Sequence, residues 1–377
     1  MRKITICVLS LAMVLGIHSL ATAASLKIGT MSPLTGNYAQ DGTDILQGVK
    51  TAVAQVEAAG GIKGFDKIEV LAEDSACDGG KATMAANKLV NSGVAGVIGA
   101  YCSSETIPAS VPINEAKIIM ITPASSNEQI TERGFKYMFR LCARDDAQAK
   151  VTVKFLEEGL KIKTLALIDD RQTYTVGLTK NITEGVNKSG KIKIVAHEHI
   201  TPGDKDFTAV LTNLKQANPD LIYLSTYQPE GSLITRQAES LGLKSKLMSE
   251  DATYHPKYLE VAGKTAEGVY FTFPPTPATP ERKNFEEQYK KAWKVDKIGS
   301  YAYYAFDSTN ILLGAIKAAG STESAKVEPA IRSTLWKGAT GEIKFDAKGD
   351  RAGGHIVWIV KGGNFVPYWD PATGKNY

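Results

Sequence analysis

The chain alternates short, mainly apolar runs with longer segments in which apolar residues recur at helical spacing. The apolar runs occupy residues 26–31, 67–74, 94–100, 118–124, 163–170, 193–200, 221–227, 246–251 and 268–273. The longer segments occupy residues 44–61, 80–93, 104–117, 146–160, 175–190, 207–218 and 231–243. Strands that alternate with helices of this length form parallel sheets covered by helices on both faces. Because one sheet of so many strands would be unusually wide, we predict an α/β fold with two doubly wound parallel-sheet lobes.

The last hundred residues break this rhythm. A proline-rich stretch, PPTPATPERK at 274–283, precedes two or three consecutive helices. The segments 341–350 and 355–369 then have the apolar content and glycine turns of β ribbons. A helical section followed by late strands predicts that the chain passes between the lobes more than once.

Residues 1–24 have the composition of a secretory signal peptide. Two basic residues precede an apolar stretch, and the small residues that follow it suit cleavage near Ala23 or Ala24. A retained anchor would need an apolar span of about 20 residues, and Ser10 and His18 interrupt this one. We therefore predict a protein that is exported to a bacterial periplasm and does not insert into the membrane.

Size and charge narrow the class of partner. The formal net charge is +4, and it falls to about +2 once the two basic residues of the leader are removed. That surplus is too small to indicate nucleic acid or anionic lipid as a partner. The remaining length of about 353 residues suits two domains. We expect a small-molecule ligand.

The segment GAYCSSETIPAS at 99–110 contains the first candidate site. In a doubly wound sheet the ligand crevice lies beyond the carboxyl ends of the strands, and Ser103 falls where a strand leads into the next helix. The free N–H groups and positive dipole end of a helix start can hold a carboxylate. The turn TPASSNE at 122–128 follows the next strand, so we predict that Ser103, the amide of Ala124 and the hydroxyl of Ser126 hold a carboxylate together. The alternative is that these serines only cap their helices.

Three cysteines remain after the leader. Cys77 follows the strand expected beside the one that ends at Cys102, so we predict a disulfide between them. Closing a loop of about 25 residues would stabilise the fold by roughly 3–4 kcal/mol on the chain-entropy model. A catalytic thiol would need a histidine nearby, and none is linked to Cys102 in the sequence. Cys142, in the apolar run FRLCA, is expected to be a buried free thiol.

The second lobe contributes aromatic and acidic groups just past its strand ends. Tyr174, Tyr227 and Tyr254 stand at such positions, as Tyr101 does in the first lobe, and the run YAYY at 301–304 adds three more tyrosines. A tyrosine offers an apolar wall with a hydroxyl at its edge, which suits a crevice that closes on a small ligand. Asp251 also follows a strand, where its carboxylate could accept an ammonium group. An α-amino acid that bridges the lobes with its two charges is therefore the predicted ligand.

The sequence offers weaker evidence for an enzyme or a metal site than for an amino-acid-binding site. The pair of histidines in HEH at 197–199 suggests zinc only weakly, because the sequence shows no third ligand. The glycine-rich nucleotide motifs, the G-x-S-x-G elbow and H-E-x-x-H are absent from the sequence. An exported hydrolase with Ser103 as nucleophile would have only Glu105 nearby as a base. We therefore expect a protein that is not an enzyme and that uses no cofactor or metal.

Several segments together resemble the leucine/isoleucine/valine-binding proteins, the periplasmic receptors of amino-acid ABC importers. The resemblance is carried by LKIGTMSPLTGNYAQDG, AAGGIKG, EDSACD, VIGAYCSS, MITPAS, DDRQTYTVGL, TYQPEGSLITRQAESLGLKS and AEGVYFTF, and it extends over essentially the whole mature chain. It implies a type I periplasmic binding protein: two lobes joined by three hinge segments, acting as a monomer that delivers its ligand to a membrane permease. The implied lobes are 25–143 with 275–351, and 144–274 with 352–377.

The resemblance also assigns roles to individual residues. It implies that Ser103, Ala124 and Ser126 hold the ligand carboxylate, that Asp251 holds the ammonium group, and that Cys77 and Cys102 form the disulfide. It places Tyr174 and Tyr227 in the ligand pocket.

Two departures from the family pattern bear on the ligand side chain. Tyr101 stands where the branched-chain receptors carry an aliphatic residue, and an aromatic wall position falls on Asp41, with Tyr38 close by. We therefore expect an aliphatic amino acid that is branched-chain or smaller, with alanine, valine or proline binding at least as well as leucine. A receptor of the same fold for aromatic or other carboxylates without an amine is the alternative.

Overall fold

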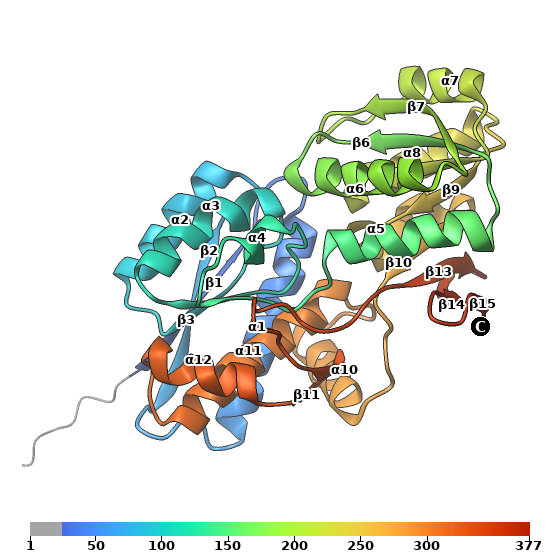
Figure 1. Ribbon diagram of the computed structural model, residues 1–377. Helices are drawn as coiled ribbons and strands as arrows, with labels where there is room; N and C mark the ends of the chain where they lie inside the picture. The colour runs from blue at the N-terminus through green and yellow to red at the C-terminus, as the bar shows by residue number, and fades with distance from the viewer. Residues whose placement is uncertain (1–24) are drawn as a thin grey trace, which may run out of the picture.

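The computed structural model describes residues 25–377, which fold into two α/β lobes (Figure 1). The predicted signal peptide and its cleavage point lie outside these residues. Within 25–377, no helix has both the length and the apolar character needed to cross a bilayer. The two-lobed arrangement of parallel sheets predicted from the alternating pattern is confirmed.

The first lobe is built on a five-stranded parallel sheet in the order β2-β1-β3-β4-β5. Its strands are β1 (Ser25–Ser32), β2 (Lys67–Asp74), β3 (Gly96–Gly99), β4 (Ile119–Thr122) and β5 (Met138–Arg140). Its helices are α1 (Ala39–Ala58), α2 (Gly79–Asn91), α3 (Ser103–Glu115), α4 (Gln129–Glu132), α10 (Pro280–Trp293), α11 (Ser300–Ala319) and α12 (Ser324–Ser333). Helices α1 and α11 pack on one face of the sheet, where Ile28 and Ile98 are buried, and α2 and α3 pack on the other, against Met31 and Val97.

The second lobe is built on an eight-stranded sheet in the order β15-β14-β13-β10-β9-β8-β6-β7. Its strands are β6 (Thr164–Asp169), β7 (Lys193–His199), β8 (Leu221–Ser225), β9 (Lys246–Ser249), β10 (Tyr270–Phe273), β13 (Ile356–Lys361), β14 (Asn364–Asp370) and β15 (Lys375–Asn376). Its helices are α5 (Asp145–Lys154), α6 (Thr173–Ser189), α7 (Thr208–Ala217), α8 (Gln228–Ser240) and α9 (Pro256–Ala262). The five strands β6 to β10 run parallel, and the last three strands of the chain add antiparallel at one edge.

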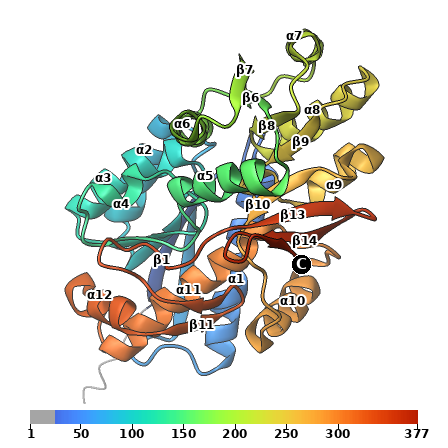
Figure 2. The ribbon, with the colours of Figure 1, turned by 45° about the vertical axis from the view of Figure 1, so that its right-hand side comes forward.

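The chain passes between the lobes three times: after β5, after β10 and before β13 (Figure 2). This agrees with the prediction of more than one passage, while the residue boundaries assigned to each lobe remain a prediction. The ribbon expected at 341–350 is shorter than predicted. Only β12 (Gly341–Ile343) forms a strand there, and it pairs with β11 (Trp336–Gly338), a partner that the apolar pattern did not reveal.

Two helices of the first lobe pack unusually closely against each other. Helices α1 and α11 meet at Gly48, where an added Cβ would lie 2.4 Å from the carbonyl oxygen of Ala302. Only glycine allows this approach. The start of α11, which contains Tyr301, is therefore held against α1.

Candidate functional site

The first half of the site is the start of helix α3. Cys102 caps the helix, and the Glu105 side chain returns to the Cys102 amide, with Oε2 accepting at 2.8 Å. The first N–H groups of a helix have no partner in a preceding turn and carry the positive end of its dipole. Ser103, at the first helical position, is only 1% exposed. The helix start thus presents donors to a space from which water is largely excluded.

The neighbouring turn is held in place by a buried arginine. Arg140 is fully buried and donates from Nη1 to the backbone oxygens of Ser126 and Asn127, at 2.7 and 2.6 Å. Its Nε donates to Asp350 Oδ1 at 2.8 Å, which neutralises its charge. The Asn127 amide in turn donates to Ser103 Oγ at 3.3 Å. This network fixes the turn after β4 beside the start of α3.

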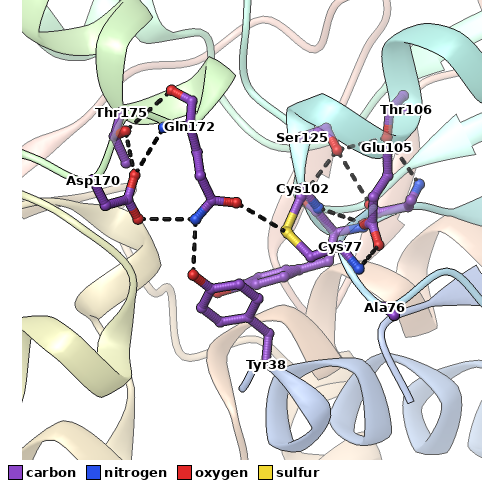
Figure 3. Close-up of a disulfide and its surroundings, with 12 residues drawn as sticks. Tyr38, Ala76, Cys77, Cys102, Glu105, Thr106, Ser125, Asp170, Gln172 and Thr175 are labelled. Atoms are coloured by element: carbon purple, nitrogen blue, oxygen red, sulfur yellow. Dashed lines mark hydrogen bonds between the residues drawn. A yellow bond between two sulfur atoms is a disulfide. The ribbon is translucent and has the colours of Figure 1, made fainter. Parts of the chain in front are cut away.

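A disulfide joins Cys77 and Cys102, as predicted (Figure 3). It connects the loop after β2 to the cap of α3, so the end of one strand is fixed to the helix start that faces the cleft. Glu105 strengthens the same connection, because its Oε1 accepts from the Cys77 amide at 2.5 Å. Cys142 is buried and is the free cysteine among the described residues, which confirms the second cysteine prediction.

Five tyrosines form a continuous wall around the cleft. The ring centroids of Tyr101 and Tyr227 are 5.5 Å apart, and those of Tyr174 and Tyr227 are 5.7 Å apart. Tyr38 lies 4.7 Å from Tyr227, and Tyr301 lies 5.6 Å from Tyr101. Burial raises the pKa of each of these phenols, so all of them are neutral donors at neutral pH.

The second half of the site is a pair of adjacent carboxyl groups after β9. The Tyr174 hydroxyl lies 2.5 Å from Glu250 Oε2 and 2.6 Å from Asp251 Oδ1. A hydroxyl has one proton, so two such short contacts require a proton on one of the carboxyl groups. Burial and the charge of Asp251 raise the pKa of Glu250 well above its usual value. Glu250 is therefore the neutral member, and the pair carries one negative charge.

That charge resides on Asp251. Burial raises its pKa, but His355, whose Nε2 lies 3.9 Å from Oδ2, and the Tyr174 hydroxyl together hold the pKa below its usual value. Asp251 is only 3% exposed. A buried anion of this kind is stabilised strongly by a cation placed beside it.

The structure brings all the predicted ligand-binding residues around one small cavity between the lobes. The predicted residues that line it are Tyr101, Ser103, Ala124, Ser126, Tyr174, Tyr227 and Asp251. Ala252 and Tyr301 line it as well. Tyr301 belongs to the run YAYY, which the sequence offered as a further source of wall tyrosines without choosing among its members, whereas nothing in the sequence pointed to Ala252. Tyr254, which also follows a strand end, stacks instead on Phe273 with ring centroids 4.2 Å apart.

Contacts between the lobes close the cleft. Gln172 Nε2, on the second lobe, donates to the Tyr38 hydroxyl at 2.8 Å and to Asp170 at 2.9 Å (Figure 3). At another point, His255 Nε2 lies 2.9 Å from Asp44 Oδ2, and both residues are buried. The cavity is thus enclosed between the two lobes.

Comparison with known proteins gives consistent matches over nearly the whole chain. The periplasmic binding protein family matches residues 25–364. A leucine-, isoleucine-, valine-, threonine- and alanine-binding protein of Pseudomonas aeruginosa is 35% identical over 89% of this chain and 90% of its own. A leucine binding protein of Thermotoga maritima has 30% identity and a TM-score of 0.83, covering 92% of this chain and 99% of its own. A branched-chain amino acid transporter substrate binding protein of Streptococcus pneumoniae, solved with isoleucine, has 27% identity and a TM-score of 0.82, covering 91% of this chain and 98% of its own.

Proposed function

The chain belongs to the periplasmic binding protein family, and on that premise we propose that it captures a small aliphatic α-amino acid between its lobes and delivers it to an ABC importer. One observation carries this proposal. A helix start without formal charge and a single buried anion, Asp251, line the same closed cavity from opposite lobes.

In this proposal the two charged ends of the amino acid occupy opposite sides of the cavity. The carboxylate accepts from the hydroxyl of Ser103, the amide of Ala124 and the hydroxyl of Ser126. The ammonium group donates to Asp251, and the tyrosines enclose the carbon atoms. Closure removes the ligand from water, so affinity depends on each charge having a partner inside the cavity.

The side chain of the ligand meets Tyr101 and Tyr227. Tyr101 is 3% exposed, and its hydroxyl has no hydrogen-bond partner among the described residues. This side chain occupies space that a long aliphatic ligand would need. We therefore propose that alanine, valine or a similarly short amino acid binds at least as well as leucine. The name of the Pseudomonas relative, which includes alanine and threonine beside the branched-chain acids, supports this range.

The setting proposed for this receptor is the periplasm, reached by a signal peptide that is cleaved near Ala23 or Ala24. The receptor acts as a monomer and presents its closed form to a membrane permease. Catalysis forms no part of the proposal. Glu105, the base that a Ser103 nucleophile would need, already accepts backbone amides with both of its carboxylate oxygens.

A receptor for carboxylates without an amine is the second candidate. It is disfavoured because such a ligand would bring no ammonium group to the buried Asp251 carboxylate and would lose that ion pair. A thermal-shift screen of the mature protein against the twenty amino acids and a set of aromatic acids tests the proposal, because a ligand that binds only the folded form raises the melting temperature. The proposal expects stabilisation by short aliphatic amino acids. Stabilisation by aromatic acids alone would overturn it.

A further inference from the structure

Two histidines occupy neighbouring outward positions on the edge strand β7. His197 and His199 are two residues apart, so their side chains project from the same face of the strand. Their rings are 4.6 Å apart, and 37% and 40% of their side chains are exposed. The residue between them, Glu198, has the opposite orientation. β7 is the last strand in the order of its sheet, so it has a neighbouring strand on one side only.

The fold adds the third group that the sequence does not reveal. β7 pairs in parallel with β6, in a register that places Asp169 opposite His199. His197 Nε2 lies 2.6 Å from Asp169 Oδ2, and His199 Nδ1 lies 2.9 Å from Asp169 Oδ1. Asp169 is 1% exposed, and the Arg171 amide donates to its Oδ1 at 2.9 Å. The carboxylate is thus held in place while both rings reach solvent.

This arrangement has the donor set of a divalent metal site. One ligand atom from each of the three residues lies within 4.8 Å of the other two. Zinc binds imidazole nitrogen and carboxylate oxygen at about 2.0–2.2 Å in tetrahedral sites, so its ligand atoms lie roughly 3.4 Å apart. To hold zinc, each ring nitrogen would have to move away from the Asp169 oxygen that it contacts by less than about 1 Å, and both rings are partly exposed. Two imidazoles with one carboxylate suit zinc, nickel or copper, whereas magnesium and calcium prefer oxygen ligands.

We propose that Asp169, His197 and His199 form a binding site for a divalent cation of the zinc type at the edge of the second lobe. The three residues fill three positions around the cation, and water fills the fourth. The site is distinct from the amino-acid cavity, because none of its residues lines that cavity. Its occupation does not depend on the proposed amino-acid function.

Titration calorimetry of the mature protein with Zn²⁺ tests the proposal, with no affinity tag present because a histidine tag would bind the metal. We expect one zinc ion per chain in the wild type and no comparable heat with Mg²⁺. His197→Asn and His199→Asn should each weaken zinc binding by at least roughly tenfold. Glu198→Gln is the matched control: it lies between the two histidines and removes a charge without removing a ligand, so zinc affinity should stay within about threefold of wild type.

Asp169→Asn should also weaken zinc binding, and a thermal melt of this variant shows whether it is folded. Asp169 is buried, so its variant could fail to fold. In that case His197→Asn and His199→Asn still test the proposal, because both of these residues are partly exposed. The proposal is overturned if wild type binds no zinc, or if both histidine variants bind it as wild type does. It is equally overturned if Glu198→Gln loses as much affinity as the histidine variants, because the effect would then be one of charge alone.

Discussion

Replacing Asp251 by asparagine keeps the shape of the side chain and removes the charge that is proposed to hold the ligand ammonium group. Asp251 is 3% exposed and contacts Tyr174 at 2.6 Å. Breaking a buried ion pair by removing one partner costs about 3–5 kcal/mol, which is roughly 150-fold to 4,000-fold in affinity. This range is the upper limit of the loss of valine affinity that we expect in titration calorimetry of Asp251→Asn.

The neighbouring carboxyl group reduces that loss and provides a control. Glu250 is neutral partly because Asp251 is charged, so removing the Asp251 charge lowers the pKa of Glu250 and lets it ionise in its place. The double variant Glu250→Gln with Asp251→Asn should therefore lose more affinity than Asp251→Asn alone. Glu250→Gln alone replaces one neutral group by another, and valine affinity should change by less than about threefold.

A ligand without an amine separates the ammonium contact from general damage to the cavity. 3-Methylbutanoate has the carboxylate and the side chain of valine but no ammonium group. The double variant Glu250→Gln with Asp251→Asn should bind this acid at least as well as the wild type does, because neither carboxyl group then leaves a buried unpaired charge. If Asp251→Asn weakened valine and 3-methylbutanoate by the same factor, the assignment of Asp251 to the ammonium group would be wrong.

Four further predictions concern the cavity and its supports. Tyr101→Leu should raise the affinity for leucine relative to alanine by about tenfold, since it frees space for about two buried CH₂ groups, and competition binding measures the ratio. Cys77→Ser removes the disulfide and should cost about 2–5 kcal/mol in urea unfolding, whereas an unchanged midpoint would contradict the structural role. Asp350→Leu leaves Arg140 buried without its counter-ion and should cost about 3–5 kcal/mol, and the pair Arg140→Met with Asp350→Leu should recover most of that. Because the pKa of Asp251 is lowered, its charge persists above the usual Asp pKa of about 3.9 and is lost only as pH falls through its own lower value. Asp251 itself should thus cause no loss of amino-acid affinity between about pH 8 and pH 5. Burial raises the pKa of Glu105 to about 7 and that of Asp41 to about 6, so the calorimetric profile is compared with that of Asp251→Asn, and a fall in this range that disappears in the variant would count against a lowered Asp251 pKa.

The sequence predicted the fold well where local patterns decide the structure. The runs at 26–31 and 163–170 form β1 and β6 because apolar, β-branched segments between turn residues are buried on both faces of a parallel sheet. The three-residue strand β5 was missed because Met138–Arg140 is too short for a periodic signal. Strand β11 was missed for the same reason.

The candidate site was predictable as far as it depends on strand ends. Ser103 and Asp251 each follow a strand, and parallel strands end at the cleft, so both positions could be inferred one lobe at a time. Tyr301 lies at the start of α11 and reaches the cavity only because the chain returns to the first lobe. Asp169 likewise joins the two histidines through the pairing of β6 with β7. Contacts of this kind depend on the tertiary arrangement, which local patterns do not encode.

The most direct measurement is a crystal structure of the mature protein grown with L-valine or L-alanine. The account predicts that the amino acid fills the cavity between the lobes, with its carboxylate within hydrogen-bond distance of Ser103 and the Ala124 amide and its nitrogen within about 3 Å of an Asp251 oxygen. A ligand bound with its carboxylate toward Asp251, or bound outside this cavity, would contradict the account.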